Sequence, residues 1–112
     1  MFDEKVKLVD FEEIDYPPAA RKANVQGTVV IQVRLDDEGH VAGASALSGS
    51  PLLIPDALAN AKKWTFKPNI YKGAVIVYEF QLIPGPCKAN SRSLFRMAHI
   101  NVAEVTACVP IV

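Results

Sequence analysis

The clearest pattern in the sequence is an alternation of apolar and polar residues after Gln26. Aliphatic side chains recur at every second position from Val29 to Leu35, which predicts a strand with one apolar face. The acidic turn Asp36–Gly39 follows, and its glycine can adopt the left-handed backbone conformation. A return strand over Val41–Ser48, rich in small residues, completes a predicted β-hairpin.

Two segments that begin with proline predict helices on either side of this hairpin. Pro17 and Pro18 suit only the first turn of a helix, so we expect a short helix from about Pro18 to Ala23. A second helix begins near Pro55, and its apolar residues recur at helical spacing as far as Trp64. We expect the side of this helix that carries Leu58 and Trp64 to be buried.

The second half of the chain predicts two more strands. Apolar and polar residues alternate over Ala74–Leu82, and Pro84–Pro86 should break that strand. A polar loop then leads to a β-rich run over Ile100–Val109, which predicts a fourth strand. Residues 1–15 are charged, with scattered apolar positions, and predict an arm or linker that holds one edge strand at most.

Composition places the chain among ordinary globular domains. It has 112 residues, of which 50% are apolar and 21% charged, and this length favours a single domain with one core. The formal net charge is zero, which argues against binding to nucleic acid or to anionic membranes. No apolar run approaches the roughly 20 residues of a membrane span, and the N-terminus lacks the apolar region of a signal peptide. We expect a soluble segment, compatible with excision from a longer anchored protein.

The charges are unevenly distributed along the chain. Acidic residues gather before Tyr16, and basic residues follow the second predicted helix: Lys62, Lys63, Lys67, Lys72, Lys88, Arg92 and Arg96. Two interpretations are open. Either both groups are solvated faces, or the basic side contacts an acidic segment of a partner.

Four short motifs occur in a fixed order. They are Tyr-Pro-x-x-Ala-Arg from Tyr16, Gly-Thr-Val-Val from Gly27, Asp-x-x-Gly-x-Val from Asp36 and Trp-x-Phe-x-Pro from Trp64. With all four in place, the chain resembles the C-terminal domain of TonB-type energy transducers from Tyr16 to about Leu82. The resemblance divides the chain into an arm (1–15), a TonB-like domain (16–82) and a C-terminal extension (83–112).

The resemblance implies a fold and a function. The fold is α+β, an antiparallel sheet of three to four strands with two helices packed on one face. The domain would lie in the periplasm, attached through a proline-rich linker to an inner-membrane helix. It would couple the energy of the proton gradient to an outer-membrane transporter by gripping the transporter's TonB box. Inner-membrane motor proteins would engage a region that precedes this chain.

The resemblance also implies a binding site. In the family, the strand after the second helix pairs its backbone with the transporter peptide. That edge corresponds here to Ala74, Val75, Ile76, Val77, Tyr78, Glu79, Phe80, Gln81 and Leu82. Further transporter contacts would fall on Asp15, Tyr16 and Pro17. Alternatively, Tyr16 and Pro17 lock the first helix onto the sheet.

The C-terminal extension suggests a second functional hypothesis. A strand over Ile100–Val109 could pair with Ala74–Leu82 and occupy the edge that a TonB box would need. The domain would then be a structural or scaffolding module of an envelope or secreted protein. A third possibility is a homodimer formed edge to edge.

Cys87 and Cys108 lie in this extension. In a domain that resembles a periplasmic one, two cysteines favour a disulfide, and the alternative is two buried thiols in a reducing compartment. His40 and His99 have no metal-ligand spacing around them, and the acidic turn is too short for calcium. The sequence therefore predicts no metal, no cofactor and no catalytic site, and it predicts that Trp64 packs in the core.

Overall fold

The computed structural model describes residues 8–68, 72–85, 93–99 and 101–110. These residues form a five-stranded sheet, a two-stranded sheet and two helices. The elements in chain order are β1 (Leu8–Asp10), α1 (Pro18–Lys22), β2 (Gly27–Leu35), β3 (Val41–Ser48), α2 (Ile54–Ala61), β4 (Thr65–Phe66), β5 (Gly73–Gly85), β6 (Leu94–His99) and β7 (Val102–Pro110).

The large sheet has the strand order β3-β2-β5-β7-β6. Strand β2 is antiparallel to β3 and β5, β7 is antiparallel to β6, and β5 and β7 are parallel. The predicted α+β class is confirmed, whereas the predicted antiparallel sheet of three to four strands is matched only roughly, because the large sheet has five strands and is mixed. Strand β6 lies two positions away from β5 in the sheet, and the chain then returns as β7 between them. This return makes β7 run in the same direction as β5.

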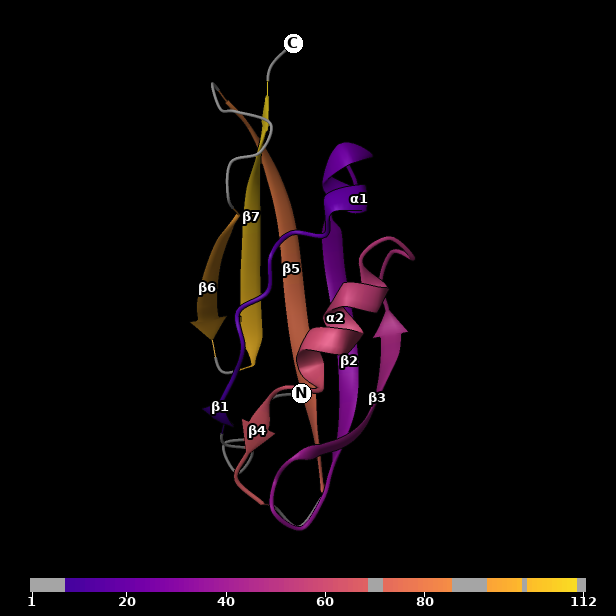
Figure 1. Cartoon of the computed structure of the whole chain (residues 1–112), viewed down its shortest axis with the longest axis vertical. Coiled ribbons are helices and arrows are strands. Elements are labelled where there is room, and N and C mark those ends of the chain that lie inside the picture. Colours follow the sequence, from indigo (N-terminus) through magenta and orange to yellow (C-terminus); the bar gives the residue numbers. More distant parts are fainter. Residues whose placement is uncertain (1–7, 69–71, 86–92, 100, 111–112) are drawn as a thin grey trace.

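Both helices lie on one face of the large sheet, together with the N-terminal segment and the β1–β4 pair (Figure 1). The core lies between these two layers. The side of β2 from Val29 to Leu35 that was predicted to be apolar is confirmed, since its four aliphatic side chains are at most 2% exposed. The opposite face of the sheet carries neither α1 nor α2.

The helices follow their sequence signals closely. Helix α1 begins at Pro18 and buries Ala20. Helix α2 ends at Ala61 and packs on β2 and β3. The prediction for its buried side is confirmed for Trp64, which lies just beyond the helix and is 1% exposed, whereas Leu58 is only half-buried. The small side chains of β3 allow this close approach of the helix to the sheet.

The N-terminal segment contributes to the core. Strand β1, which pairs with β4, is the single edge strand that was expected in the arm. The ring of Phe11 lies 5.8 Å from that of Trp64 and 5.7 Å from that of Phe95, and Ile14 is buried. These contacts connect the start of the described chain to β6.

Two boundaries in the second half differ from the prediction. Strand β5 continues through Pro84 to Gly85 instead of ending at Leu82. Strand β2 begins opposite Phe80, so within the described residues the end of β5 is paired on the β7 side alone and tolerates a proline there. Strand β6 forms where a polar loop was expected, because Phe95 and its apolar neighbour two positions on pack against the core.

Candidate functional site

Strand β5 is the central strand of the sheet. Residues from Val77 to Phe80 pair with β2 on one side and with β7 on the other. Between Gly73 and Ile76 the described pairing of β5 is with β2, and beyond Phe80 it is with β7. The expectation that the C-terminal strand could pair with this edge is confirmed. Peptide binding along Ala74–Leu82 stays a prediction, and over much of its length it requires β7 to leave.

Strand β7 is held in place by core packing and by α1. Its inward side chains, Ala103, Val105 and Ala107, are at most 1% exposed. The guanidinium of Arg21 donates hydrogen bonds from Nε and Nη2 to the carbonyl oxygen of Cys108, at 3.2 and 2.7 Å. The first helix therefore clasps the strand that covers β5.

Tyr16 lies at the junction of α1, β5 and the C-terminal extension. Its ring packs edge-on against Phe80 with centroids 5.4 Å apart, and its hydroxyl donates to the carbonyl oxygen of Val25. Burial raises the pKa of Tyr16 to about 12. This geometry suits a residue that locks α1 onto the sheet, while transporter contact by Asp15, Tyr16 and Pro17 stays a prediction.

Ser93, the residue before β6, contacts the same segment. Its hydroxyl accepts a hydrogen bond from the backbone N–H of Tyr16 at 3.0 Å and donates to Oδ1 of Asp15 at 3.3 Å. The C-terminal extension thus lies against both places where a transporter contact was predicted: β7 covers β5, and Ser93 bridges Asp15 and Tyr16.

Comparison with known proteins identifies the domain. The family model for the Gram-negative bacterial TonB protein C-terminal matches residues 12–83. This chain belongs to the TonB C-terminal domain family. It is also similar to Protein TonB of Vibrio cholerae serotype O1 (strain ATCC 39315 / El Tor Inaba N16961), with 33% identity over 69 residues. That alignment covers 60% of this chain and 28% of the relative.

The family match supports a TonB-like role for the domain, and it ends at residue 83, where the C-terminal extension begins. The matched region contains the motifs from Tyr16 to Pro68 and most of β5. Strands β6 and β7 lie beyond it. The segment that covers β5 is therefore an addition to the region that defines the TonB family match.

Asn60 is a buried polar residue that sequence reasoning missed. It is 6% exposed, and its Oδ1 accepts hydrogen bonds from Trp64 Nε1 and from the Tyr78 hydroxyl, both at 2.8 Å. Its Nδ2 donates to the carbonyl oxygens of Glu12 and Glu13, at 3.0 and 3.4 Å. The sequence signal that could have identified Asn60 is its place, as a polar residue, on the apolar side of α2. The network joins α2, β5 and the N-terminal segment, so its role is structural.

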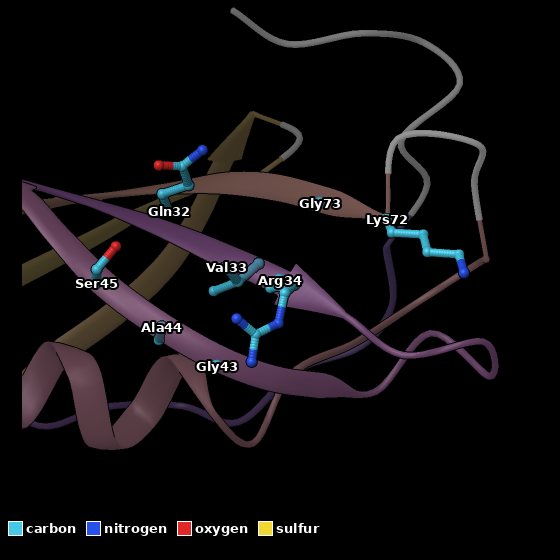
Figure 2. Close-up of a pocket in the computed structure, with 8 residues that line it drawn as sticks. All are labelled: Gln32, Val33, Arg34, Gly43, Ala44, Ser45, Lys72 and Gly73. Carbon is cyan, nitrogen blue, oxygen red and sulfur yellow. The ribbon is translucent and has the colours of Figure 1, made fainter.

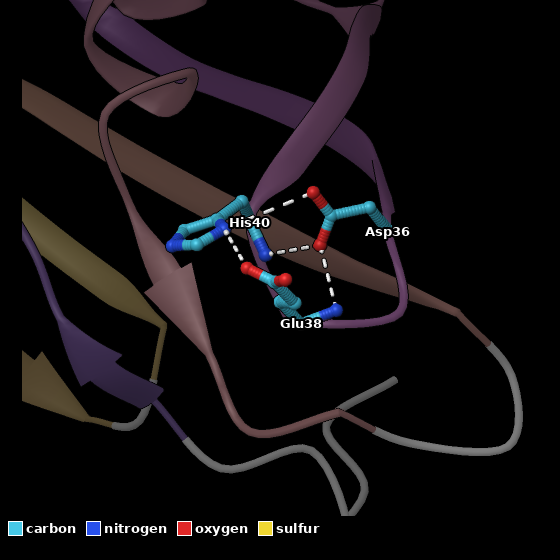
Figure 3. A network of polar contacts seen from close by, with 3 residues as sticks. All are labelled: Asp36, Glu38 and His40. Carbon is cyan, nitrogen blue, oxygen red and sulfur yellow. Dashed lines mark hydrogen bonds and ion pairs between the residues drawn. The ribbon is translucent and has the colours of Figure 1, made fainter.

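The acidic turn of this TonB-family domain is organised by its own backbone (Figure 3). Oδ1 of Asp36 accepts hydrogen bonds from the backbone N–H groups of Glu38 and His40, both at 2.9 Å. These bonds, that from His40 first, hold the pKa of Asp36 below its usual value. His40 Nδ1 lies 3.7 Å from Asp36 Oδ2 and 3.6 Å from Glu38 Oε2. Within the described residues, no group of three or more His, Cys, Asp or Glu side chains could hold a metal ion.

Cys108 lies in β7 and is not a free thiol, whereas Cys87 lies outside the described residues. None of the helices that the structure describes is long and apolar enough to cross a membrane.

A shallow depression of about 500 Å³ lies on the sheet between β2, β3 and the start of β5 (Figure 2). Its lining contains two cations and no carboxylate: Gln32, Val33, Arg34, Gly43, Ala44, Ser45, Lys72 and Gly73. Lys72 Nζ lies 2.9 Å from Asp37 Oδ1, and this pair raises the pKa of Lys72. Arg34 has no hydrogen bond or ion pair within the described part of the chain.

Proposed function

We propose that this chain is a non-enzymatic, periplasmic module of the TonB C-terminal family that acts as a structural or scaffolding part of an envelope protein. One observation carries the proposal, namely that the backbone of β5 is paired on both sides from Val77 to Phe80. A strand with neighbours on both sides has no unpaired N–H and C=O groups to offer an added peptide. The fold thus works as a closed module in contact with other proteins through its remaining surfaces.

The way the extension is built into the fold supports this proposal. Strand β7 supplies buried side chains to the core and receives the Arg21 clasp, while Ser93 bonds to the segment before α1. A strand that contributes core side chains cannot leave without exposing their apolar partners on β5 to water. Closure of the edge is consequently coupled to the stability of the whole domain.

A disulfide between Cys87 and Cys108 forms part of the proposal. Cys108 is not a free thiol, and the chain has two cysteines in total. A cross-link in this position closes the segment that contains β6 and contributes about 3 kcal/mol through loop entropy. A count of reactive thiols in the native protein tests it, and two reactive thiols would contradict it.

The second candidate is the energy-coupling role known for the TonB family. Membership of the family favours it, as does the parallel pairing of β5 with β7, which is slightly weaker per residue than antiparallel pairing. In this case β7 gives way, and the TonB box of an outer-membrane transporter pairs with Ala74–Leu82 in its place. Inner-membrane motor proteins would act through a region outside this chain.

A peptide titration separates the two candidates. The ¹⁵N-labelled, oxidised chain is titrated to millimolar concentration with a synthetic peptide that carries a TonB box. The structural proposal predicts no change in the amide signals between Val77 and Leu82. The same titration is repeated on Arg21→Ala, which removes the clasp on β7, and on Lys22→Ala as the control. Lys22 is an exposed cation on the same helix.

The outcomes of the titration distinguish a closed edge from transporter docking. Shifts along Val77–Leu82 in the intact chain would overturn the closed-edge proposal in favour of transporter docking. Shifts that appear in Arg21→Ala and not in Lys22→Ala would show that closure by β7 is what excludes the peptide. They would also favour a transducer whose docking strand is gated.

A further inference from the structure

Strand β3 is an unprotected edge of the sheet within the part of the chain that the structure describes. It is the outermost strand beside β2, and its eight residues, Val41–Ser48, include neither a charge nor a proline. Soluble proteins usually protect such an edge with lysine, proline or a covering element, because its free backbone groups pair readily with another chain. The edge strand at the other side of the sheet, β6, does carry a charge, since Arg96 pairs with Glu104 at 2.7 Å.

Beside this edge, the long side chain of Arg34 lies between two glycines. Arg34 on β2 is the direct cross-strand partner of Gly43 on β3 and of Gly73 on β5. Its guanidinium lies over Gly43, where an added Cβ would come within 3.1 Å of Nη2 and 3.4 Å of Cζ (Figure 2). The glycine therefore leaves an open path from the outer side of β3 to the guanidinium.

The surroundings of Arg34 favour an anion of single charge. Its guanidinium is unpaired within the described residues, whereas the other cation of the depression, Lys72, is already paired with Asp37. Gln32 and Ser45, cross-strand partners in the next row of the same depression, add neutral hydrogen-bond donors. One unpaired guanidinium with neutral donors matches a carboxylate, while a phosphate dianion would call for a second free cation.

We propose that the outer edge of β3 binds an extended, acidic segment of a partner protein, and that a carboxylate of this segment crosses Gly43 to pair with Arg34. An added strand would lie about 4.8 Å from β3, and β2 lies about the same distance on its other side. Two long side chains can therefore meet above the glycine between them. Backbone pairing supplies the contact along β3, and Arg34 selects the acidic residue.

A second copy of the chain fits this edge less well. In a β3–β3 dimer, the strand added to the edge would again be Val41–Ser48, which has no carboxylate to meet Arg34. The two guanidinium groups would remain unpaired on the same face of the continuous sheet. The proposal is also independent of whether β5 is closed, because β3 and β7 are separated by two strands in the sheet.

The test uses a capped nine-residue peptide of alternating threonine and valine with one central glutamate and a short glycine-serine flank at each end. The matched peptide has glutamine in place of the glutamate. Both are titrated into the ¹⁵N-labelled full chain, and the amide signals of Val41–Ser48 and the Nε–H signal of Arg34 are followed. We expect shifts at both places with the glutamate peptide and about fivefold weaker binding of the glutamine peptide, the effect of one exposed ion pair.

Two variants locate the carboxylate contact. Arg34→Gln should weaken binding of the glutamate peptide about fivefold and make the two peptides equivalent. Arg96→Gln, which removes the same charge from the opposite edge strand, should leave both affinities unchanged. Circular dichroism of each variant confirms that it is folded.

Several results would overturn the proposal. These are equal binding of the two peptides by the wild-type chain, shifts on β6 or β5 in place of β3, and no shifts at millimolar peptide. Concentration-dependent broadening of the β3 signals without peptide would instead identify the edge as a contact between copies of the chain.

Discussion

Asn60 shows how one buried side chain can connect separate parts of this fold. Its amide oxygen accepts from Trp64 and Tyr78, and its amide nitrogen donates to the backbone of Glu12 and Glu13. Burial raises the pKa of Tyr78 above its usual value, so its hydroxyl stays protonated and donates. In a buried site each of these groups would be costly without its partner.

Replacing Asn60 by alanine should therefore lower the free energy of unfolding by about 3 kcal/mol, because several buried polar groups lose their partners at once. Tyr78→Phe removes one donor and leaves Asn60 bonded to Trp64, so it should cost about 1 kcal/mol. Urea denaturation of both variants measures these losses. Equal losses for the two variants would contradict the role of Asn60 as the centre of the network.

The turn carboxylate of Asp36 should contribute to acid sensitivity. Its pKa is lowered in the folded state, so its stabilisation is present above the usual aspartate pKa of about 3.9 and is lost as the pH falls through the lower folded value. Asp36→Asn should flatten this part of the dependence of the unfolding free energy on pH. Denaturant titrations between about pH 2.5 and 6 measure it.

Glu12→Gln provides the control for this experiment. The side chain of Glu12 is exposed and makes no hydrogen bond or ion pair within the described residues. If both variants changed the acid limb of the pH profile equally, the backbone hydrogen bonds to Asp36 would not be its cause.

At the scale of elements, the hairpin turn has the geometry that its sequence predicts. Gly39 has a φ of +88°, in the left-handed region, and its carbonyl oxygen accepts from the backbone N–H of Phe66 at 2.9 Å. The sequence predicted the left-handed glycine from its place after an acidic turn. It could not show that β4 passes directly over the same residue.

Gly39→Ala should be more destabilising than the same change at Gly27. A Cβ at Gly39 would lie 1.8 Å from the carbonyl oxygen of Phe66, so the strand β4 must move, and we expect a loss of about 3 kcal/mol. Gly27 has a φ of +142° with no atom within 4 Å of an added Cβ, so only backbone strain remains, of about 1 kcal/mol. Thermal and urea denaturation compare the two, and a larger loss at Gly27 would contradict the clash.

The elements that were predicted correctly have strong local signals. Strand β2 has an uninterrupted two-residue alternation, and α1 begins at a proline. Strand β6 was missed because its alternation extends over only a few residues around Phe95 and lies in a stretch with many polar residues. The end of β5 was misplaced because Pro84 signals a break unless one side of the strand is open, and that depends on where β2 begins.

At the scale of the whole molecule, the C-terminal extension covers the side of β5 that faces away from β2. It adds β6 and β7, fills the core beside β5 and contacts the segment around Tyr16. The stability of the domain should therefore depend on residues that lie beyond its family match.

Reduction of the proposed disulfide measures that dependence. A reducing agent should lower the free energy of unfolding by about 3 kcal/mol and speed hydrogen exchange of the β7 amides, because the unfolded chain gains freedom. Urea denaturation with and without reductant shows the effect. The Cys87→Ser, Cys108→Ser double variant should have the same free energy of unfolding as the reduced protein, and the reductant should not change it. A wild-type chain that is equally stable with and without reductant would contradict the cross-link.

The sequence alone determined the local elements and the family. Period-two alternation, the prolines that begin helices and the turn glycine each act over a few residues. These local signals can therefore be recognised in the sequence, and they specified β2, α1, the hairpin and the core face. Only the tertiary structure decided which strands are neighbours, because pairing between residues far apart depends on the competition for each edge of the sheet. That competition placed β7 beside β5, left β3 exposed and brought Gly43 beneath Arg34, and these three results decide which surfaces the domain can offer a partner.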